Sequence, residues 1–245
     1  MSNFISQILT YLYLFLIGIT SIFFFLVALL IKAFTFPFDK KLIVLNLFTS
    51  FWSSCYLWCV PTWNIKKIGR ENFSIKKNYI VVSNHQSQMD IFLAFYLFLP
   101  FRWISKREVF NIPFIGWNML LNKYVGIKRG DKESVKKMMK QCESILASGC
   151  SLFFFPEGTR SDTGKVKPFK PGAFILAKKM KVNILPIIIQ GTRDILPKNS
   201  ARLTWRGKMN ISVLDEISYK DFDDKSPEQS AEMVHDLFVK ILGEN

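Results

Sequence analysis

The first 64 residues of the chain are largely apolar, whereas the remainder alternates short apolar runs with polar segments. No charged residue lies between positions 2 and 31, and residues 12–31 supply the roughly 20 apolar residues that a helix needs to cross a membrane. The stretch is not typical of a secretory signal, because no basic residue precedes it and no small-residue cleavage site follows it. We therefore predict a membrane-anchoring helix rather than a buried core helix.

A second uncharged stretch, residues 42–64, has a different pattern. Its polar residues recur at steps of three and four and draw a stripe along one side of a helix, which favours a position in the membrane interface. Lysines follow both apolar stretches, and basic residues favour the cytoplasmic side. Because two complete spans would separate these lysines, we expect one span plus an interfacial helix, or a hairpin dipping into one leaflet, with residues 1–64 as a membrane-anchoring unit. The polar stripe consists of Asn46, Thr49, Ser50 and Ser53.

Beyond residue 64 the pattern is typical of an α/β domain, expected to cover residues 65–245. Amphipathic helices are predicted over residues 132–147 and 226–242, and a helix over residues 91–99. Strands alternating with helices predict a mixed, largely parallel sheet flanked by helices. The apolar runs that read as strands cover residues 79–82, 101–104, 124–127, 152–155, 184–189 and 211–214.

The net charge of +14 is concentrated in this second part, because residues 1–64 contribute only +2. Such a balance favours an anionic partner: nucleic acid, an anionic membrane surface or a phosphorylated small molecule. The sequence shows no G-x-G-x-x-G and no Walker loop, so a tightly bound nucleotide cofactor is not expected. Four cysteines lack the spacing of a metal site and are interpreted as reduced thiols, namely Cys55, Cys59, Cys142 and Cys150.

Residues 84–90, NHQSQMD, combine a histidine with a carboxylate between a predicted strand and a predicted helix. Ser87 followed by Asp90 resembles a capping box, which would start the helix near Gln88. His85 then belongs to the preceding turn, and Asp90 can reach back to one ring nitrogen and fix the tautomer. The other ring nitrogen would accept a proton. The alternative is that His85 is an ordinary turn or capping residue.

Residues 155–160, FPEGTR, follow the predicted strand 152–155. Ligands of open α/β sheets gather at the carboxyl ends of strands, where Gly158 would allow close backbone approach and Arg160 would offer paired donors to a phosphate. Glu157 would accept a hydrogen bond from a polyol hydroxyl or hold Arg160 in place. The alternative is a surface turn with an incidental ion pair.

Taken in order, these segments resemble the glycerophospholipid acyltransferase family, in particular its bacterial 1-acylglycerol-3-phosphate acyltransferases. The family's N-H-x-x-x-x-D signature is met at 84–90, its F-P-E-G-T-R-S signature at 155–161, and its strand with an internal proline at 184–187. In the segment 169–174, Pro171 departs from the basic or polar residue expected there. The remaining signature, between the first two, is matched by Lys106, Glu108, Pro113, Gly116 and Arg129.

The resemblance implies a membrane enzyme of the bacterial inner membrane whose catalytic domain faces the cytoplasm. It would move a fatty acyl group from acyl-coenzyme A or acyl carrier protein to the sn-2 hydroxyl of 1-acylglycerol 3-phosphate, giving phosphatidic acid. No metal, cofactor or covalent acyl-enzyme is implied. His85 and Asp90 would be catalytic, and the acceptor would be bound by Glu157, Gly158, Thr159, Arg160, Arg129, Lys106 and Lys170.

Three alternatives stay open at this stage. The acceptor could be glycerol 3-phosphate or another lysophospholipid. A membrane serine hydrolase or thioesterase would use similar acyl chemistry, but no G-x-S-x-G nucleophile elbow occurs in the sequence. A nucleic-acid-binding protein is suggested by charge alone. Its aromatic residues should interleave with basic ones, whereas here they fall in apolar runs, so no nucleic-acid partner is expected.

Overall fold

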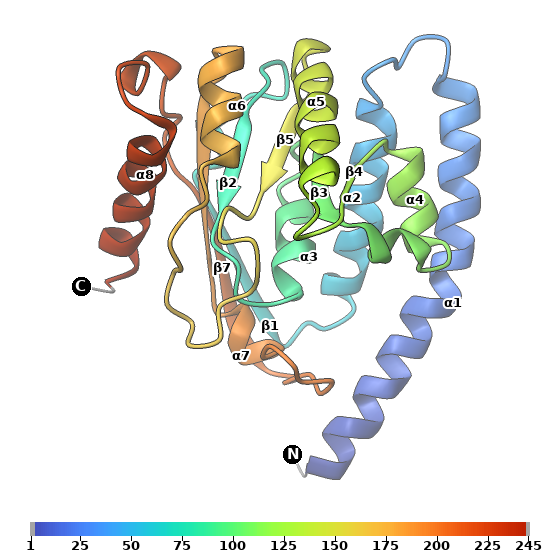
Figure 1. The fold of residues 1–245 in the computed structure, drawn as a ribbon. Helices are drawn as coiled ribbons and strands as arrows, with labels where there is room; N and C mark the ends of the chain where they lie inside the picture. The colour runs from blue at the N-terminus through green and yellow to red at the C-terminus, as the bar shows by residue number, and fades with distance from the viewer. Residues whose placement is uncertain (1–2, 244–245) are drawn as a thin grey trace.

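A computed structural model of the chain, which describes residues 3–243, is built on one seven-stranded sheet (Figure 1). The strand order is β1-β7-β6-β2-β5-β3-β4, and β7 is antiparallel to β6 while every other pair is parallel. The predicted mixed, largely parallel sheet is therefore confirmed. The strands are β1 (Trp63–Ile68), β2 (Ile80–Ser83), β3 (Phe101–Lys106), β4 (Val125–Ile127), β5 (Ser151–Phe154), β6 (Ile184–Gln190) and β7 (Gly207–Val213).

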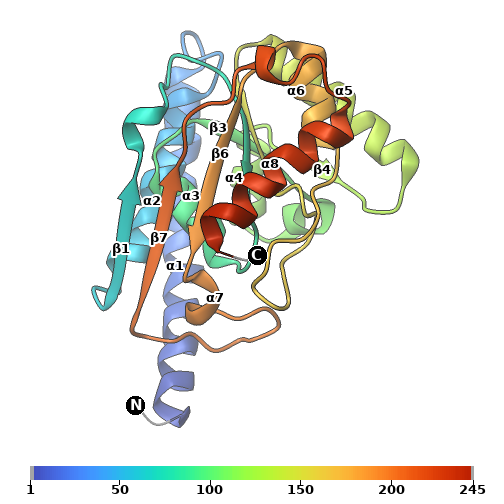
Figure 2. The ribbon, with the colours of Figure 1, turned by 90° about the vertical axis from the view of Figure 1, so that its left-hand side faces the viewer.

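Helices cover both faces of the sheet and enclose two cores (Figure 2). Successive side chains of a strand point to opposite faces of the sheet and therefore into different cores. On β2, Val81 points into the core under α1, α2 and α3, while Ile80 and Val82 point into the core under α5, α6 and α8. The helices are α1 (Asn3–Thr35), α2 (Ile43–Trp58), α3 (Met89–Tyr96), α4 (Ile115–Leu121), α5 (Lys132–Ala147), α6 (Gly172–Met180), α7 (Thr192–Ile195) and α8 (Pro227–Leu242), with short 3-10 turns at Arg70–Asn72, Arg107–Asn111 and Tyr219–Asp221.

Strand β1 is an element that the hydrophobic pattern did not predict. Its sequence WNIKKI buries only Trp63 fully, and its two lysines are exposed. This composition is typical of an edge strand, where charged side chains prevent further pairing. The strand begins at Trp63, just before the expected start of the α/β domain at residue 65.

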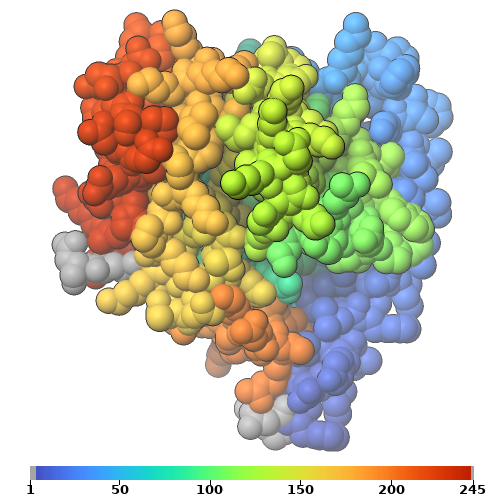
Figure 3. Space-filling model, viewed as in Figure 1, coloured from blue at the N-terminus to red at the C-terminus, as the bar shows by residue number. Residues whose placement is uncertain are grey.

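Helix α1 runs along the whole side of the molecule (Figure 3). Its segment Phe4–Thr35 is long and apolar enough to cross a membrane, and only 11% of its most apolar window is buried within the protein. It packs against α2 and α4, where Phe25 contacts Phe114 and Trp117 edge to face. Most of its remaining surface consists of exposed apolar side chains, a composition suited to contact with lipid.

The polar stripe of α2 faces the protein rather than water. Asn46, Thr49, Ser50 and Ser53 are all buried, and Asn46 Nδ2 donates to the carbonyl of Phe101 at 2.7 Å. The exposed side of α2 instead carries apolar residues such as Phe51. The stripe was interpreted as the mark of an interfacial helix, but it arises because α2 hydrogen-bonds to neighbouring elements through its polar side.

Candidate active site

The motif residues come together because parallel strands end at the same edge of a sheet. Strand β2 leads into His85, and its neighbour β5 leads into the turn 155–160. Next to β5, β3 ends at Lys106, and β4 beyond it ends two residues before Arg129. On the other side of β2, β6 leads into Thr192. Five segments that are far apart in sequence therefore meet at one edge.

His85 and Asp90 form the contact that the sequence indicated. The ring atom Nδ1 of His85 lies 2.8 Å from Oδ2 of Asp90, and α3 begins at Met89, which leaves His85 in the preceding turn. Because a carboxylate only accepts hydrogen bonds, this geometry assigns the proton to Nδ1 and leaves Nε2 as the acceptor. The imidazole is 15% exposed and the carboxylate is fully buried. The arrangement can remove a proton from a group that approaches Nε2.

The Asp90 carboxylate holds the turn in place through further hydrogen bonds. Its Oδ2 accepts the backbone N–H groups of Gln86 and Ser87 at 2.7 and 2.8 Å, and its Oδ1 accepts the hydroxyl of Thr192 at 2.5 Å. The bond from Ser87 N is the half of the expected capping box that the structure retains. The Ser87 hydroxyl instead accepts from Met89 N and donates to the carbonyl of Leu196. Asp90 is thus fixed from four directions.

The imidazole ring is also held from its flat side. Phe155 stacks on His85 with ring centroids 3.9 Å apart and planes 10° apart, and Trp103 stacks on Phe155 in turn. Asn84 anchors the start of the turn to β6, donating to the carbonyl of Ile189 and accepting its N–H, both at 2.8 Å. Because ring and backbone are both constrained, Nε2 has a defined direction.

Glu157 is buried and joins the two motifs. Its Oε1 accepts the backbone N–H of His85 at 2.7 Å, and its Oε2 accepts that of Lys167 at 3.1 Å. Within the described residues it makes no ion pair with Arg160. Burial raises the pKa of Glu157 from its ordinary 4.5 to about 7, and the two N–H donors oppose this only in part. The side chain therefore ties the FPEGTR turn to the His85 turn.

This raised pKa predicts a pH-dependent stability. The folded protein holds the Glu157 proton up to about pH 7 while the unfolded chain releases it near 4.5, so the stabilisation is complete below pH 4.5 and is lost as the pH rises to 7. The glutamine of a Glu157→Gln variant stays neutral throughout. Between pH 5 and pH 8 the variant should gain about 2 to 3 kcal/mol in unfolding free energy relative to the parent. Denaturant unfolding in detergent measures the unfolding free energy of both proteins at each pH. If the two free energies changed in parallel with pH, the raised pKa of Glu157 would be contradicted.

Gly158 and its neighbours form the part of the turn that was predicted to bind a phosphate. Gly158 has φ +74°, and a side chain there would collide with Lys170, whose Nζ would lie 2.9 Å from the added carbon. The Lys170 ammonium therefore lies directly over this turn. Arg160 is half-buried, and its guanidinium makes no hydrogen bond or ion pair with any described residue. Its donors are available to a ligand.

Thr159, Lys106 and Arg129 are exposed at the same edge. Lys106 and Arg129 make no ion pair with a described residue. Gly116, of the same signature as Lys106, has a packing role, because a side chain there would collide with the backbone oxygen of Phe110. The two cations thus add positive charge to the edge where Arg160 and Lys170 lie.

Several residues of this site were not anticipated from the sequence. Thr192 binds Asp90 across more than a hundred positions of sequence, and only its place directly after Gly191 at a strand end could have suggested it. Phe155 was recognised as part of a motif but not as the ring that stacks on His85. Ser161 N also donates to the carbonyl of His85 at 2.7 Å and closes the contact between the two motifs.

Comparison with known proteins gives a consistent result. A family model described as Acyltransferase matches residues 64–190. A 1-acyl-sn-glycerol-3-phosphate acyltransferase of Chlamydomonas reinhardtii is 42% identical over 62% of this chain, and the chain spans less than half, 46%, of that protein. The enzyme of the same name from Helicobacter pylori is 30% identical over 71% of this chain and 76% of its own length.

A solved structure agrees over the full length. The crystal structure of the 1-acyl-sn-glycerophosphate acyltransferase PlsC from Thermotoga maritima superposes with a TM-score of 0.83, at 26% identity over 99% of this chain and 97% of that one. The agreement includes the N-terminal helices, which lie outside the matched family model. The resemblance inferred from the four motifs is thereby confirmed, and the chain belongs to the acyltransferase family that includes the 1-acyl-sn-glycerol-3-phosphate acyltransferases.

Proposed function

We propose that this protein transfers a fatty acyl group from an acyl thioester to the sn-2 hydroxyl of 1-acylglycerol 3-phosphate, giving phosphatidic acid and a free thiol. The observation that carries the proposal is the His85–Asp90 pair, which holds an accepting imidazole nitrogen at one edge of the sheet. At the same edge lie four cations that make no ion pair with a described residue, namely Arg160, Lys170, Lys106 and Arg129. The imidazole nitrogen can accept the proton of the substrate hydroxyl, and the cations can bind the phosphate of the same substrate. The relatives named above act on this substrate class according to their names.

In the proposed reaction, Nε2 of His85 takes the proton of the acceptor hydroxyl as its oxygen attacks the thioester carbonyl carbon. Asp90 stabilises the imidazolium that forms, since its Oδ2 lies 2.8 Å from Nδ1. The tetrahedral intermediate then collapses, the carbon–sulfur bond breaks, and the imidazolium returns the proton to the departing thiolate. Proton and electron pairs balance without metal or cofactor, and the acyl group moves directly between substrates.

The acceptor phosphate is assigned to Arg160 and Lys170, with Lys106 and Arg129 adding long-range attraction. Glu157 acts as a positioning residue, because both its oxygens are already bonded to backbone N–H groups. Gly158 and Thr159 would contribute backbone and hydroxyl contacts to the glycerol phosphate. The donor, acyl-coenzyme A or acyl carrier protein, is itself anionic and would approach the same basic edge.

Replacing Arg160 with lysine should mainly weaken use of the phosphate-bearing acceptor. The guanidinium offers two parallel donors to a phosphate, whereas an ammonium is a point charge. We expect KM for 1-acylglycerol 3-phosphate to rise about 10-fold, with KM for the acyl donor within about twofold. Steady-state kinetics with each substrate varied in turn measure this. Impaired donor use with unchanged acceptor use would contradict the division of roles.

We also propose that residues 1–64 hold the protein on the inner membrane of a bacterium with the α/β domain in the cytoplasm. The exposed apolar surface of α1 and the lysines of the α1–α2 loop support this placement. The burial of the polar side of α2 favours a helical pair attached to the α/β domain over two independent spans.

The reaction is tested with detergent-purified protein, a long-chain acyl-coenzyme A and a panel of acceptors. Equal amounts of thiol and phosphatidic acid from 1-acylglycerol 3-phosphate, well above the rates with glycerol 3-phosphate and lysophosphatidylcholine, are the expected result. Preference for another acceptor would overturn the substrate assignment. Thiol release without lipid product would indicate a thioesterase, and tight, steeply salt-dependent oligonucleotide binding would revive a nucleic-acid partner.

A further inference from the structure

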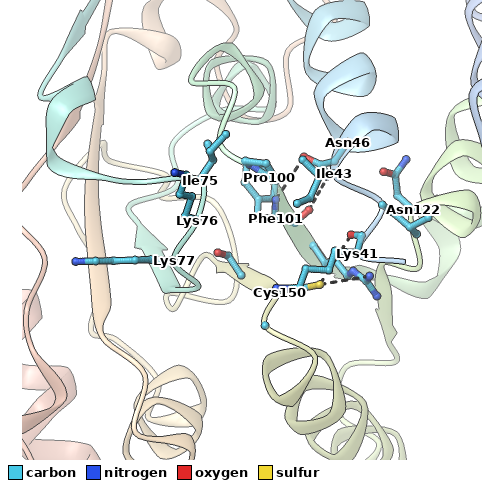
Figure 4. Close-up of a pocket in the computed structure, with 14 residues that line it drawn as sticks. Lys41, Ile43, Asn46, Ile75, Lys76, Lys77, Pro100, Phe101, Asn122 and Cys150 are labelled. Atoms are coloured by element: carbon cyan, nitrogen blue, oxygen red, sulfur yellow. Dashed lines mark hydrogen bonds between the residues drawn. The ribbon is translucent and has the colours of Figure 1, made fainter. Parts of the chain in front are cut away.

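Two adjoining pockets lie at the edge of the sheet opposite to His85, where the parallel strands begin. One, of about 310 Å³, is enclosed by the start of α2, the segment before β2 and the first residues of β3 and β5 (Figure 4). The other, of about 430 Å³, lies between β4, the end of α5 and the α1–α2 loop. Ser151, at the start of β5, lines the first pocket, whereas Glu157 follows the carboxyl end of the same strand. The pockets are therefore separate from the active site.

Both pockets are strongly basic. Among the described residues that line them none is acidic. Lys77 forms an ion pair with Glu216 at 2.8 Å, whereas the other lining cations make no ion pair with a described residue. A cluster of this kind is costly by self-repulsion unless an anion occupies it. The uncompensated cations are Lys40, Lys41, Lys76, Arg102 and Lys123.

Arg102 lines both pockets and is the most informative of these cations. The residue is only 8% exposed, and the one hydrogen bond that its guanidinium makes within the described residues goes to Sγ of Cys150 at 3.6 Å. Sulfur is a weak acceptor, and a buried guanidinium is ordinarily paired with a carboxylate. The Lys41 ammonium lies over Gly149 in the same pocket: a Cβ atom added to Gly149 would lie 2.7 Å from Lys41 Nζ.

Asn122 is a polar residue of the same pocket wall (Figure 4). It is 1% exposed, and its Nδ2 donates to Thr49 Oγ1 at 3.1 Å and to the carbonyl of Asn118 at 3.0 Å. Its Oδ1 is buried without a hydrogen-bond partner in the part of the chain that the structure describes. An unsatisfied buried oxygen is costly, but this one is enclosed by protein atoms and is not open to a ligand in the pocket. The cationic donors of Arg102 and Lys41 are therefore the groups of this pocket that match an anion, and a phosphate offers them several acceptor oxygens.

We propose that these pockets bind a phosphate group, at a site distinct from the acyl-transfer centre and independent of the reaction proposed above. The group could belong to a glycerophospholipid headgroup or to a soluble phosphate. The adjoining α1–α2 segment exposes Phe34, Phe36 and Phe38, each more than 70% exposed, so a membrane surface lies within reach of the pockets. Arg102 and Lys41 bind the phosphate oxygens.

The test compares Arg102→Gln and Lys41→Gln with Lys136→Gln, a matched removal of an exposed charge on α5. Native mass spectrometry in neutral detergent counts bound phosphatidylglycerol against phosphatidylcholine, and calorimetry measures inorganic phosphate. We expect Arg102→Gln to weaken binding about 10-fold or more and Lys41→Gln about two- to fivefold, with Lys136→Gln unchanged. Lys41 is exposed, so its variant keeps the test valid if Arg102→Gln fails to fold.

The two probes identify the source of the phosphate. Loss of phosphatidylglycerol binding in the pocket variants assigns the site to a lipid headgroup. Loss confined to inorganic phosphate assigns it to a soluble phosphate. Binding that is unaffected by both pocket variants, or that falls as much in Lys136→Gln as in Lys41→Gln, would overturn the proposal, because the attraction would then belong to the general surface charge.

Discussion

Replacing His85 with alanine is expected to lower kcat/KM for acyl transfer by about 10²–10⁴-fold, the usual contribution of a general base. The variant loses the ring that Asp90 orients and, in the proposed reaction, the nitrogen that takes a proton from the acceptor hydroxyl. Folding should be preserved, because the imidazole makes no other hydrogen bond with the described residues and its backbone contacts to Glu157 and Ser161 do not depend on the side chain.

The chain supplies its own control, since it contains one other histidine. His235 lies on α8, where its ring contacts Asp236 and Phe169 and makes no contact with the turn that carries His85. His235→Ala should retain at least about half of the parent rate. Initial rates of phosphatidic acid formation, with circular dichroism to verify folding, measure both variants. A folded His85→Ala protein that kept more than about a tenth of the activity would exclude His85 as the base.

Replacing Asp90 with asparagine is expected to lower kcat by about 10²–10⁴-fold while leaving the fold largely intact. Asparagine has the same shape, and its oxygen can still accept from Gln86 N and Ser87 N while its amide donates to Thr192. The negative charge that stabilises the imidazolium is lost, however. Asp90→Ala should be far more harmful, because it removes every acceptor for these donors in a fully buried position, at a cost of about 3–5 kcal/mol.

A comparable carboxylate elsewhere tests whether the effect is specific. Asp131 caps the first turn of α5 by accepting the N–H of Ser134, and it lies outside the motif turns. Asp131→Asn should cost at most about 1 kcal/mol of stability and leave kcat unchanged. Steady-state rates at saturating substrate, beside melting curves, separate the two cases. If Asp90→Asn raised only KM and left kcat intact, the carboxylate would serve binding rather than proton transfer.

The sequence predicted those parts of the site that depend on local geometry. His85 and Asp90 meet because a turn precedes the helix, and the order of polar residues in NHQSQMD was sufficient to indicate this. The sheet was predictable because β2, β5 and β6 are short apolar runs buried on both faces. Strand ends of a parallel sheet then placed the FPEGTR turn beside His85.

Contacts set by tertiary packing were not predictable in the same way. Glu157 was expected to face a ligand or Arg160, but its burial turns it toward the N–H groups of His85 and Lys167. Thr192 reaches Asp90 only because β6 pairs with β2. No local pattern records such a pairing.

The same holds for the N-terminal part of the chain. The polar stripe of α2 has the periodicity of a water-facing side, yet it hydrogen-bonds inside the protein through Asn46 and Thr49. Periodicity defines the sides of a helix but not which of them is covered. Strand β1 was missed for a related reason: Lys66 and Lys67 mask an edge strand whose pairing with β7 is parallel and distant in sequence.

The central claim is that His85 activates the acceptor for direct transfer, and rapid-quench kinetics test it most directly. Enzyme is mixed with acyl-coenzyme A, with and without 1-acylglycerol 3-phosphate, and thiol and phosphatidic acid are followed through the first turnover. Direct transfer predicts that both products appear together, without a burst, and that no thiol is released when the acceptor is absent. A burst of thiol equal to the enzyme concentration, with an acyl group covalently attached to the protein, would contradict the mechanism.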